Sequence, residues 1–238
     1  MKEEKGQFVK RLFDTIAGRY DLFNTISSLH FDKHWRRLAV EQSQLASGMR
    51  VLDVCTGTGE LALACAAAMS DQPCQSPGQV VGLDLSAPML RIAVRKAIRR
   101  GQSVEWLFGD ALGLPFRDGA FARVIIGFST RNLVNLSLAL REMHRVLAPQ
   151  GRLVILETGK PRSPLMRAAY FLYLRTVVVL IGVLLFWKAW PFTYFQRSVV
   201  RFWEPHEFVR VLREIGFAPV RHRALGGGIS ALYVAIKT

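Results

Sequence analysis

The sequence predicts an α/β fold with a mostly parallel sheet that is covered by helices on both faces. From Arg50 onward, short apolar runs alternate with segments of helical periodicity. Such alternation requires crossover connections, which join parallel strands and place helices on both faces of the sheet. The chain has 238 residues, of which half are hydrophobic and 21% charged. This composition supports a sizeable core and excludes a disordered or fibrous protein.

Residues 1–45 are predicted to form a helical cap ahead of the sheet. Phe8, Leu12 and Ile16 recur at four-residue steps, as on one face of a helix. Residues 19–37 are predicted to be a polar turn region. The rest of the chain, residues 46–238, is predicted to be one domain that carries the sheet.

Seven strands and four main helices are expected in this domain. The expected strands are residues 50–55, 79–86, 103–110, 121–128, 151–158, 217–225 and 229–237. The expected helices are residues 61–69, 87–100, 136–147 and 204–217. Ser86 is expected to cap the second of these helices, and Pro149 and Gly151 to stop the third. Residues 70–79 are expected to be a polar loop.

An aromatic-rich insertion at about residues 160–203 interrupts the alternation. Within it, residues 176–187 carry no charge and lie between Arg175 and Lys188. A helix of that length rises only ~18 Å, against ~30 Å of bilayer hydrocarbon. A membrane span would have to extend through Arg175, so we expect a buried or interfacial segment. Its valine content also suits a strand, which leaves its secondary structure open.

A glycine-rich turn follows the first strand of the domain. Gly57 and Gly59 permit positive backbone dihedrals and close approach of a ligand. A strand, a glycine turn and a helix in succession are typical of a site for a nucleotide-like ligand at the carboxyl ends of the strands. Residues 57–62 also satisfy the GxGxxA pattern of dinucleotide-binding folds, so the turn alone does not identify the ligand.

Three acidic residues at successive strand ends indicate the ligand more closely. Asp53 precedes the turn, Asp84 ends the second strand and Asp110 follows the third. Asp84 suits ribose hydroxyls, Asp53 an ammonium group, and Asp110 with Ala111 the edge of an adenine. S-adenosylmethionine carries all of these groups and no phosphate, so the acids favour it over NAD. The alternative is that each acid only caps a turn.

Six motifs occur in an order that resembles a known family. They are VLDVCTGTGE, VVGLDLSAPML, GDALGLPF, FSTRNLVN, ALREMHRVLAPQGRLVILE and GGGISALYVAIK. Together with RLFDTIAGRYDLFN near the start, they resemble the C-methyltransferases of ubiquinone and menaquinone biosynthesis, the demethylmenaquinone methyltransferase family. The resemblance runs from Phe13 to Lys237. One departure is Asp32-Lys33, where the family commonly has His-Arg.

The resemblance implies a Rossmann-like class I S-adenosylmethionine-dependent methyltransferase with a seven-stranded sheet. The implied reaction is C-methylation of a prenylated quinol, with demethylmenaquinol as the leading acceptor. With the residues above, the expected donor-binding set is Asp53, Gly57, Thr58, Gly59, Asp84, Leu85, Asp110 and Ala111. The resemblance assigns the reaction centre to Arg131 and Asn132, and the substrate side to Tyr20.

The reaction requires an electron-rich ring carbon, so the neighbouring hydroxyl must lose or share its proton. Arg131 suits stabilisation of a phenolate, but its high pKa makes it a poor proton acceptor. A structural salt bridge is its alternative role, and the general base stays open. No metal is expected, because methyl transfer from a sulfonium needs none and His30 and His34 have no evident third ligand.

The charge balance predicts an anionic partner. Lys and Arg number 32 against 18 Asp and Glu, a formal net charge of +14. We expect a cytoplasmic protein with peripheral contact to an anionic membrane at its inner face. The insertion aromatics suit a pocket wall, a core patch or a homodimer face equally.

Three other interpretations remain open. One changes only the acceptor, to a ubiquinone precursor or another small aromatic. Another is a basic nucleic-acid-binding protein or RNA methyltransferase, although no nucleic acid is expected because the aromatics cluster in an apolar insertion rather than a basic groove. The last is a membrane-associated protein that keeps the fold without catalysis.

Overall fold

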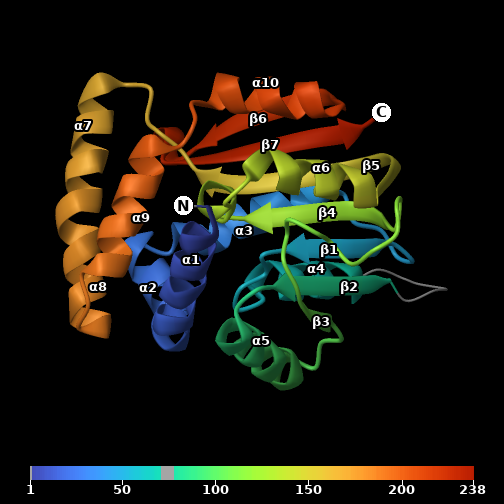
Figure 1. Cartoon of the computed structure of the whole chain (residues 1–238), viewed down its shortest axis with the longest axis horizontal. Coiled ribbons are helices and arrows are strands. Elements are labelled where there is room, and N and C mark those ends of the chain that lie inside the picture. Colours follow the sequence, from blue (N-terminus) through green and yellow to red (C-terminus); the bar gives the residue numbers. More distant parts are fainter. Residues whose placement is uncertain (1, 71–77) are drawn as a thin grey trace.

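The computed structural model, which describes residues 2–70 and 78–238, contains a seven-stranded sheet in the order β3-β2-β1-β4-β5-β7-β6 (Figure 1). The strands are β1 (Arg50–Val54), β2 (Gln79–Asp84), β3 (Glu105–Phe108), β4 (Phe121–Gly127), β5 (Leu147–Thr158), β6 (Phe217–Leu225) and β7 (Ser230–Lys237). All neighbours pair in parallel except β7, which is antiparallel to both β5 and β6. The predicted α/β fold is confirmed, and the predicted loop at residues 70–79 lies mostly outside the described residues.

Helices cover both faces of the sheet, as the alternation predicts. On one face, α6 (Leu136–Val146) and α10 (Pro205–Ile215) enclose a core with β4, β5 and β7. On the other, α3 (Phe31–Ser43) and α4 (Glu60–Ser70) pack over β1 and β5. At the β3 end, α5 (Ala87–Arg100) is capped by the residue before it, Ser86, whose hydroxyl accepts a hydrogen bond from the Met89 N–H.

Two predicted boundaries are wrong. Helix α6 ends at Val146, and β5 begins at the next residue, so Pro149 and Gly151 lie inside the strand rather than stopping the helix. A register shift between Phe121 and Arg123 of β4 accommodates the early part of β5. The strand tolerates Pro149 because the pairing is irregular there.

Residues 19–37 are mostly helical, so the predicted polar turn region is wrong. After α1 (Lys2–Ile16), the chain forms α2 (Tyr20–Ser27) and then α3. The apolar residues in this region are spaced to reach the core, and Phe23 and Trp35 are buried. Tertiary packing of these side chains outweighs the polar composition between them.

The apolar insertion is helical, and the strand alternative for residues 176–187 is excluded. Helix α7 (Pro164–Tyr173), a π-helical turn (Leu174–Val178) and α8 (Val179–Phe186) run on as one 23-residue helix. At ~1.5 Å per residue this helix is ~34 Å long, and it is the one helix in the described part of the chain that is long and apolar enough to cross a membrane. Only 22% of its most apolar window is buried, so most of this segment is not part of a core, and the interfacial alternative stays a prediction.

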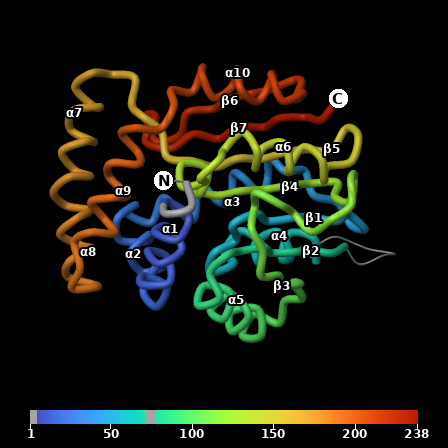
Figure 2. Tube along the Cα trace, viewed as in Figure 1, coloured from blue at the N-terminus to red at the C-terminus, as the bar shows by residue number. Residues whose placement is uncertain are grey.

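The N-terminal helices and the insertion lie side by side although they are far apart in sequence (Figure 2). Buried residues of α1, α2, the π-helical turn and α9 (Trp190–Arg201) form a third core. Phe23 and Phe192 are in direct contact, with ring centroids 4.5 Å apart. This helical layer faces the carboxyl ends of β1 and β4, where the site is expected (Figure 1).

Gly59 provides a test of the packing behind the glycine turn. Its φ is +82°, and an added Cβ would lie 2.6 Å from a ring carbon of Trp106. We therefore expect Gly59→Ala to lower the free energy of unfolding by about 1–3 kcal/mol, as overpacking does. The control is Gly113→Ala, where no atom lies within 4 Å of the added Cβ. Equal unfolding midpoints for the two variants in urea would contradict this account.

Candidate active site

A cavity at the carboxyl ends of β1, β2 and β3 brings the predicted donor-binding residues together. Its lining includes Asp53, Gly57, Thr58, Asp84, Leu85, Asp110 and Ala111. Of the predicted set, Gly59 is not part of this lining, since it lies against Trp106 and Ala93 instead. We call this space the donor cavity.

Asp84 organises the glycine turn. Its Oδ2 accepts a hydrogen bond of 2.7 Å from the Gly57 N–H, and its Oδ1 accepts one of 2.8 Å from the Ser86 N–H. Burial raises the pKa of this carboxyl, while the backbone N–H groups oppose that shift. Each oxygen keeps a further lone pair, so Asp84 can accept hydrogen bonds from a ligand as well.

Asp53 is more deeply buried, with 1% of its surface exposed. Its Oδ2 accepts hydrogen bonds from the Thr56 hydroxyl and the Ala62 N–H, whereas Oδ1 has no partner. Burial raises the pKa of this carboxyl to about 7. An unpartnered buried oxygen in the lining of the donor cavity fits a ligand that brings a hydrogen-bond donor or a positive charge.

Asp110 is the most exposed of the three acids. Its Oδ1 accepts a hydrogen bond from the Leu112 N–H, which fixes the turn after β3. Ala111, directly after it, is buried. The acid therefore both caps a turn and lines the donor cavity, so the two roles considered for it are compatible.

Hydrogen bonds join the helical cap to residues of the donor cavity, and the sequence patterns did not reveal these contacts. Thr58 of the glycine turn donates a hydrogen bond of 2.6 Å to Asp21 of α2. The helix-capping Ser86 donates one of 2.6 Å to Asp14 of α1. Asp21 also pairs with Lys96 of α5 at 2.5 Å. These contacts hold α1 and α2 over the residues that line the cavity.

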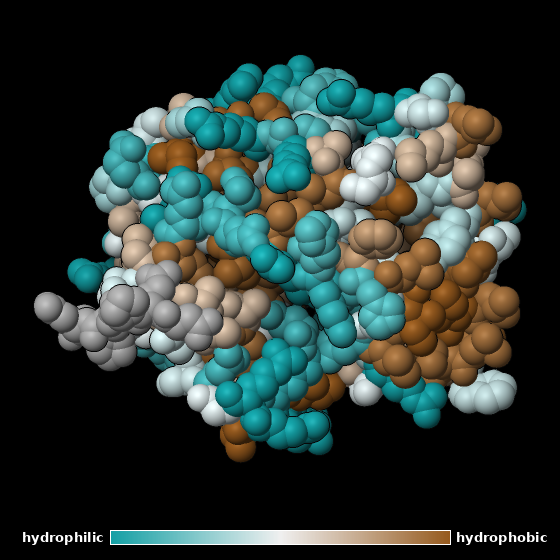
Figure 3. All heavy atoms as spheres, turned by 180° about the vertical axis from the view of Figure 1, so that it is seen from behind, coloured by the Kyte–Doolittle hydropathy of each residue, from teal (hydrophilic) through white to brown (hydrophobic). Residues whose placement is uncertain are grey.

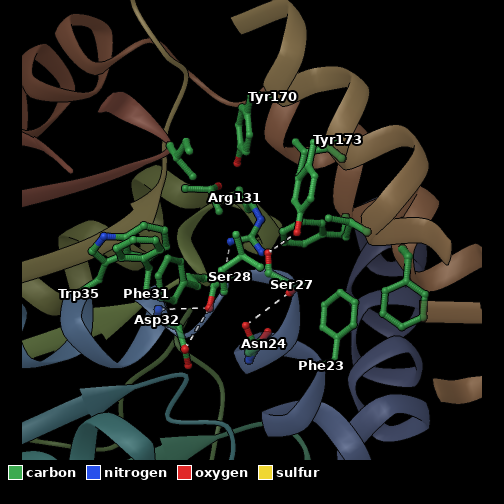
Figure 4. A pocket seen from close by; sticks show the side chains of 18 of the residues that line it. Phe23, Asn24, Ser27, Ser28, Phe31, Asp32, Trp35, Arg131, Tyr170 and Tyr173 are labelled. Carbon is green, nitrogen blue, oxygen red and sulfur yellow. Dashed lines mark hydrogen bonds between the residues drawn. The ribbon is translucent and has the colours of Figure 1, made fainter. Parts of the chain in front are cut away.

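A second, larger cavity lies between the cap and the insertion (Figure 4). Its volume is about 530 Å³, and most of its lining is apolar. Aromatic side chains from several elements contribute to it, namely Phe13, Tyr20, Phe23, Phe31, Trp35, Phe128, Tyr170, Tyr173, Phe192, Tyr194 and Phe195. A mostly apolar cavity with a few polar groups is typical of a site for an apolar ligand. We call this space the acceptor cavity.

Five residues line both cavities and form the wall that separates them. They are Phe13, Tyr20, Arg36, Phe128 and Asn132. Asn132 of the predicted reaction centre and the predicted substrate-side residue Tyr20 belong to this wall. The amide Nδ2 of Asn132 is buried and has no partner, so it is free to donate to a ligand in either cavity.

Arg131 lines the acceptor cavity and is also part of a buried ion pair. Its Nη1 lies 2.5 Å from Oε1 of Glu157, and the two side chains are 5% and 0% exposed. The guanidinium also lies over the Phe195 ring, 4.9 Å from its centroid. Glu157 lines neither cavity. Arg131 is thus held in place from behind by Glu157 while it remains part of the cavity wall.

No group of three or more His, Cys, Asp or Glu side chains that could hold a metal occurs among residues 2–70 and 78–238. His30 precedes α3 in a left-handed backbone conformation, and His34 lies within that helix.

The sheet order, the glycine turn and the three acids at the strand ends define an S-adenosylmethionine-dependent methyltransferase of class I. Solved structures share this fold. One, described as a possible histamine N-methyltransferase from Thermotoga maritima, aligns with a TM-score of 0.67 at 18% identity, over 97% of this chain and all of that one. Another S-adenosylmethionine-dependent methyltransferase, from Aquifex aeolicus, has a TM-score of 0.62 at 20% identity, over 85% of this chain and 89% of that one.

The chain belongs to the ubiE/COQ5 methyltransferase family, whose profile matches residues 1–237. A demethylmenaquinone methyltransferase from Deinococcus radiodurans is 40% identical over 236 residues, which cover 99% of this chain and 95% of the relative. A ubiquinone/menaquinone biosynthesis C-methyltransferase from Geotalea uraniireducens is 39% identical, over 98% of both chains. The resemblance stated from the sequence motifs is confirmed.

Asp84 provides a test of the donor cavity. Asp84→Ala removes the acceptor of the Gly57 N–H and the proposed ribose contact, so we expect binding of S-adenosylhomocysteine to weaken at least 100-fold, by about 3 kcal/mol. Isothermal titration calorimetry measures this loss. The control is Asp118→Ala, whose side chain is 80% exposed and outside the cavity. Unchanged affinity in Asp84→Ala would refute the ribose role.

Proposed function

We propose that this methyltransferase transfers a methyl group to a ring carbon of a prenylated quinol, with demethylmenaquinol as its acceptor. The observation that carries this proposal is the common wall between a donor cavity rich in carboxylates and an apolar acceptor cavity of about 530 Å³. The names of the 35–41% identical relatives support the same acceptor.

The donor cavity suits S-adenosylmethionine because of the groups it presents. Asp84 would accept from the ribose hydroxyls, and the unpartnered Oδ1 of Asp53 would face the ammonium group. Asp110 and Ala111 would border the adenine. When bound, S-adenosylmethionine supplies an electrophilic methyl group on a sulfonium.

On the acceptor side, this chain's own residues hold the ring and stabilise charge. The wall residues Tyr20 and Asn132 place the ring against the donor cavity. Arg131, fixed by Glu157, stabilises the negative charge that develops on the phenol oxygen. The apolar lining excludes water, which strengthens this interaction and protects an oxidisable quinol.

The same proposal includes a cytoplasmic location with peripheral contact to an anionic membrane, where a prenylated quinol dissolves. The contact surface would be the outer face of α7 and α8, where Leu172, Leu180, Leu184 and Trp187 are 58–84% exposed. Figure 3 shows hydrophobic side chains gathered at that edge of the molecule. Residues 158–203 contain seven Lys and Arg and no Asp or Glu, which favours anionic headgroups.

The reaction is tested with labelled methyl donor and a lipid extract that contains quinones. We expect the label in a menaquinone-type product, identified by mass spectrometry. Label in a ubiquinone precursor would transfer the proposal to that acceptor. Label in RNA alone, or no label despite donor binding, would overturn it.

Arg131 is tested by Arg131→Ala. We expect turnover to fall about 100-fold or more, as for loss of an oxyanion donor, while S-adenosylhomocysteine affinity is retained. Because this variant leaves Glu157 buried and unpaired, Arg131→Ala combined with Glu157→Gln serves as the folding control. Full turnover in either variant would remove Arg131 from the mechanism.

Membrane contact is tested by sedimentation with vesicles of phosphatidylglycerol or of phosphatidylcholine. We expect binding to the anionic vesicles that weakens with salt, and at least a tenfold loss of binding in the double variant Leu180→Glu and Leu184→Glu. The control is Leu138→Glu, at a 41% exposed position on α6. If the double variant instead dissociates a dimer and wild type ignores vesicles, the surface is a homodimer face.

A further inference from the structure

The reaction proposed above needs a group that accepts the proton of the ring hydroxyl, and the acceptor cavity contains one carboxylate among its described lining residues. That carboxylate is Asp32, in the first turn of α3. It is 5% exposed, so it belongs to the interior of the site rather than to a solvated helix face. A few polar groups placed in an otherwise apolar cavity are what orient a ligand there.

Asp32 is held in a defined orientation. Its Oδ1 accepts a hydrogen bond of 3.0 Å from the Ser28 hydroxyl, and its Oδ2 pairs with Arg36 one turn further along α3 (Figure 4 shows the Ser28 contact). Each carboxylate oxygen has a further lone pair, so the group can still accept a proton from a ligand. The salt bridge with Arg36 holds the carboxylate in place on α3.

Arg36 connects this carboxylate to the wall between the two cavities. Its guanidinium lies 5.9 Å from the centroid of the Phe128 ring, and both residues line the donor and the acceptor cavity. Methyl transfer has to occur across this wall. Asp32 therefore contacts, through Arg36, the wall across which the ring and the methyl group would meet.

The other titratable or charged groups that face the acceptor cavity are poorer proton acceptors. Arg36 and Arg131 are cations. Burial raises the pKa values of Tyr170, Tyr173 and Tyr194, so these side chains stay hydroxyls at neutral pH. Tyr20 contributes one more phenol to the lining.

A second buried carboxylate, Glu157, is excluded by its position. It accepts hydrogen bonds from Thr130, Arg131 and Thr158 and does not line the acceptor cavity. The site thus has two Arg–carboxylate pairs. In the pair Arg131–Glu157 only the arginine lines the acceptor cavity, whereas in the pair Arg36–Asp32 both partners line it.

We propose that Asp32 is the general base of the methyl transfer and that Arg36 is its positioning residue. The O–H bond of the hydroxyl beside the reacting carbon breaks, oxygen keeps the electron pair, and the proton passes to Asp32. The ring carbon forms a bond to the methyl group while the carbon–sulfur bond breaks with its electron pair on sulfur. The proton displaced from that ring carbon leaves to water, and Asp32 returns its own proton to the phenol oxygen.

The test is Asp32→Asn, assayed with a soluble short-chain quinol kept reduced. The amide still accepts the Ser28 hydrogen bond but cannot take a proton. We expect kcat at pH 7 to fall 100-fold or more, in the range found for loss of a general base, with S-adenosylhomocysteine affinity within twofold of wild type. Asp118→Asn, at an exposed acid outside the cavity, is the matched control and should retain wild-type turnover.

The pH profile separates a base from a structural role. At neutral pH and above, wild-type kcat should be level with pH. In Asp32→Asn, kcat should rise about tenfold per pH unit, because the phenol-type hydroxyl, with a pKa of about 10, must ionise unaided. A uniform loss at every pH, or a full rate, would overturn the assignment.

A second variant, Asp32→His, keeps the proposal testable if Asp32→Asn folds poorly. Imidazole is also a base, so the turnover of Asp32→His should be at least tenfold higher than that of Asp32→Asn. Its kcat should show a new rise at about pH 6.5. Failure of His to restore any turnover in a protein that binds S-adenosylhomocysteine would contradict the inference. If wild type itself binds that compound but methylates no quinol, the proposed function fails instead.

Discussion

The structure depends on one constraint: two ligands of opposite character have to meet through a single wall. The methyl donor is charged and polar, and the proposed acceptor is an apolar ring with an apolar tail. The sheet meets the first requirement by bringing the ends of β1, β2 and β3 to one edge, so that three acids share a cavity. The cap and the insertion provide for the apolar acceptor, because their aromatic side chains line the acceptor cavity beside that edge of the sheet. Five residues border both the donor cavity and the acceptor cavity. They are Phe13 and Tyr20 from the N-terminal segments, Arg36 from α3, and Phe128 and Asn132 from the region after β4.

The donor half of this arrangement could be predicted from sequence because it rests on local signals. Parallel buried strands are continuous apolar runs, and residues at or just beyond the carboxyl end of each run lie at the same edge of the sheet. Asp53, Asp84 and Asp110 follow this rule, and the structure brings them into one cavity. Gly59 does not follow the expectation from its motif. A glycine in the motif suggested ligand approach, whereas its neighbours are Trp106 and Ala93, so the constraint on it is packing.

The acceptor half was less predictable because it depends on contacts between distant segments. Residues 19–37 look polar until Phe23 and Trp35 are placed against the insertion and the sheet. Arg175 lies within the π-helical turn that joins α7 to the charge-free α8, so counting only the charge-free residues underestimated the length of the helix. The pairing of Arg131 with Glu157 spans 26 residues, and no local pattern reveals it. Asp32 was visible in sequence only as a departure from the family's usual basic residue.

The long helix formed by α7 and α8 illustrates how one element serves two environments. Tyr170, Leu174 and Val178 recur at four-residue steps and are buried against the cap and α9. A helix at the surface of a soluble protein normally has polar residues on the opposite face. Here the opposite face carries Leu172, Leu180 and Leu184, which are exposed, so both faces of the helix are apolar. Because the inner face also lines the acceptor cavity, a lipid surface on the outer face would leave one helix thickness between the bilayer and the bound ring. An apolar substrate could then reach the cavity without its tail crossing water, which is the costly step for a prenylated molecule.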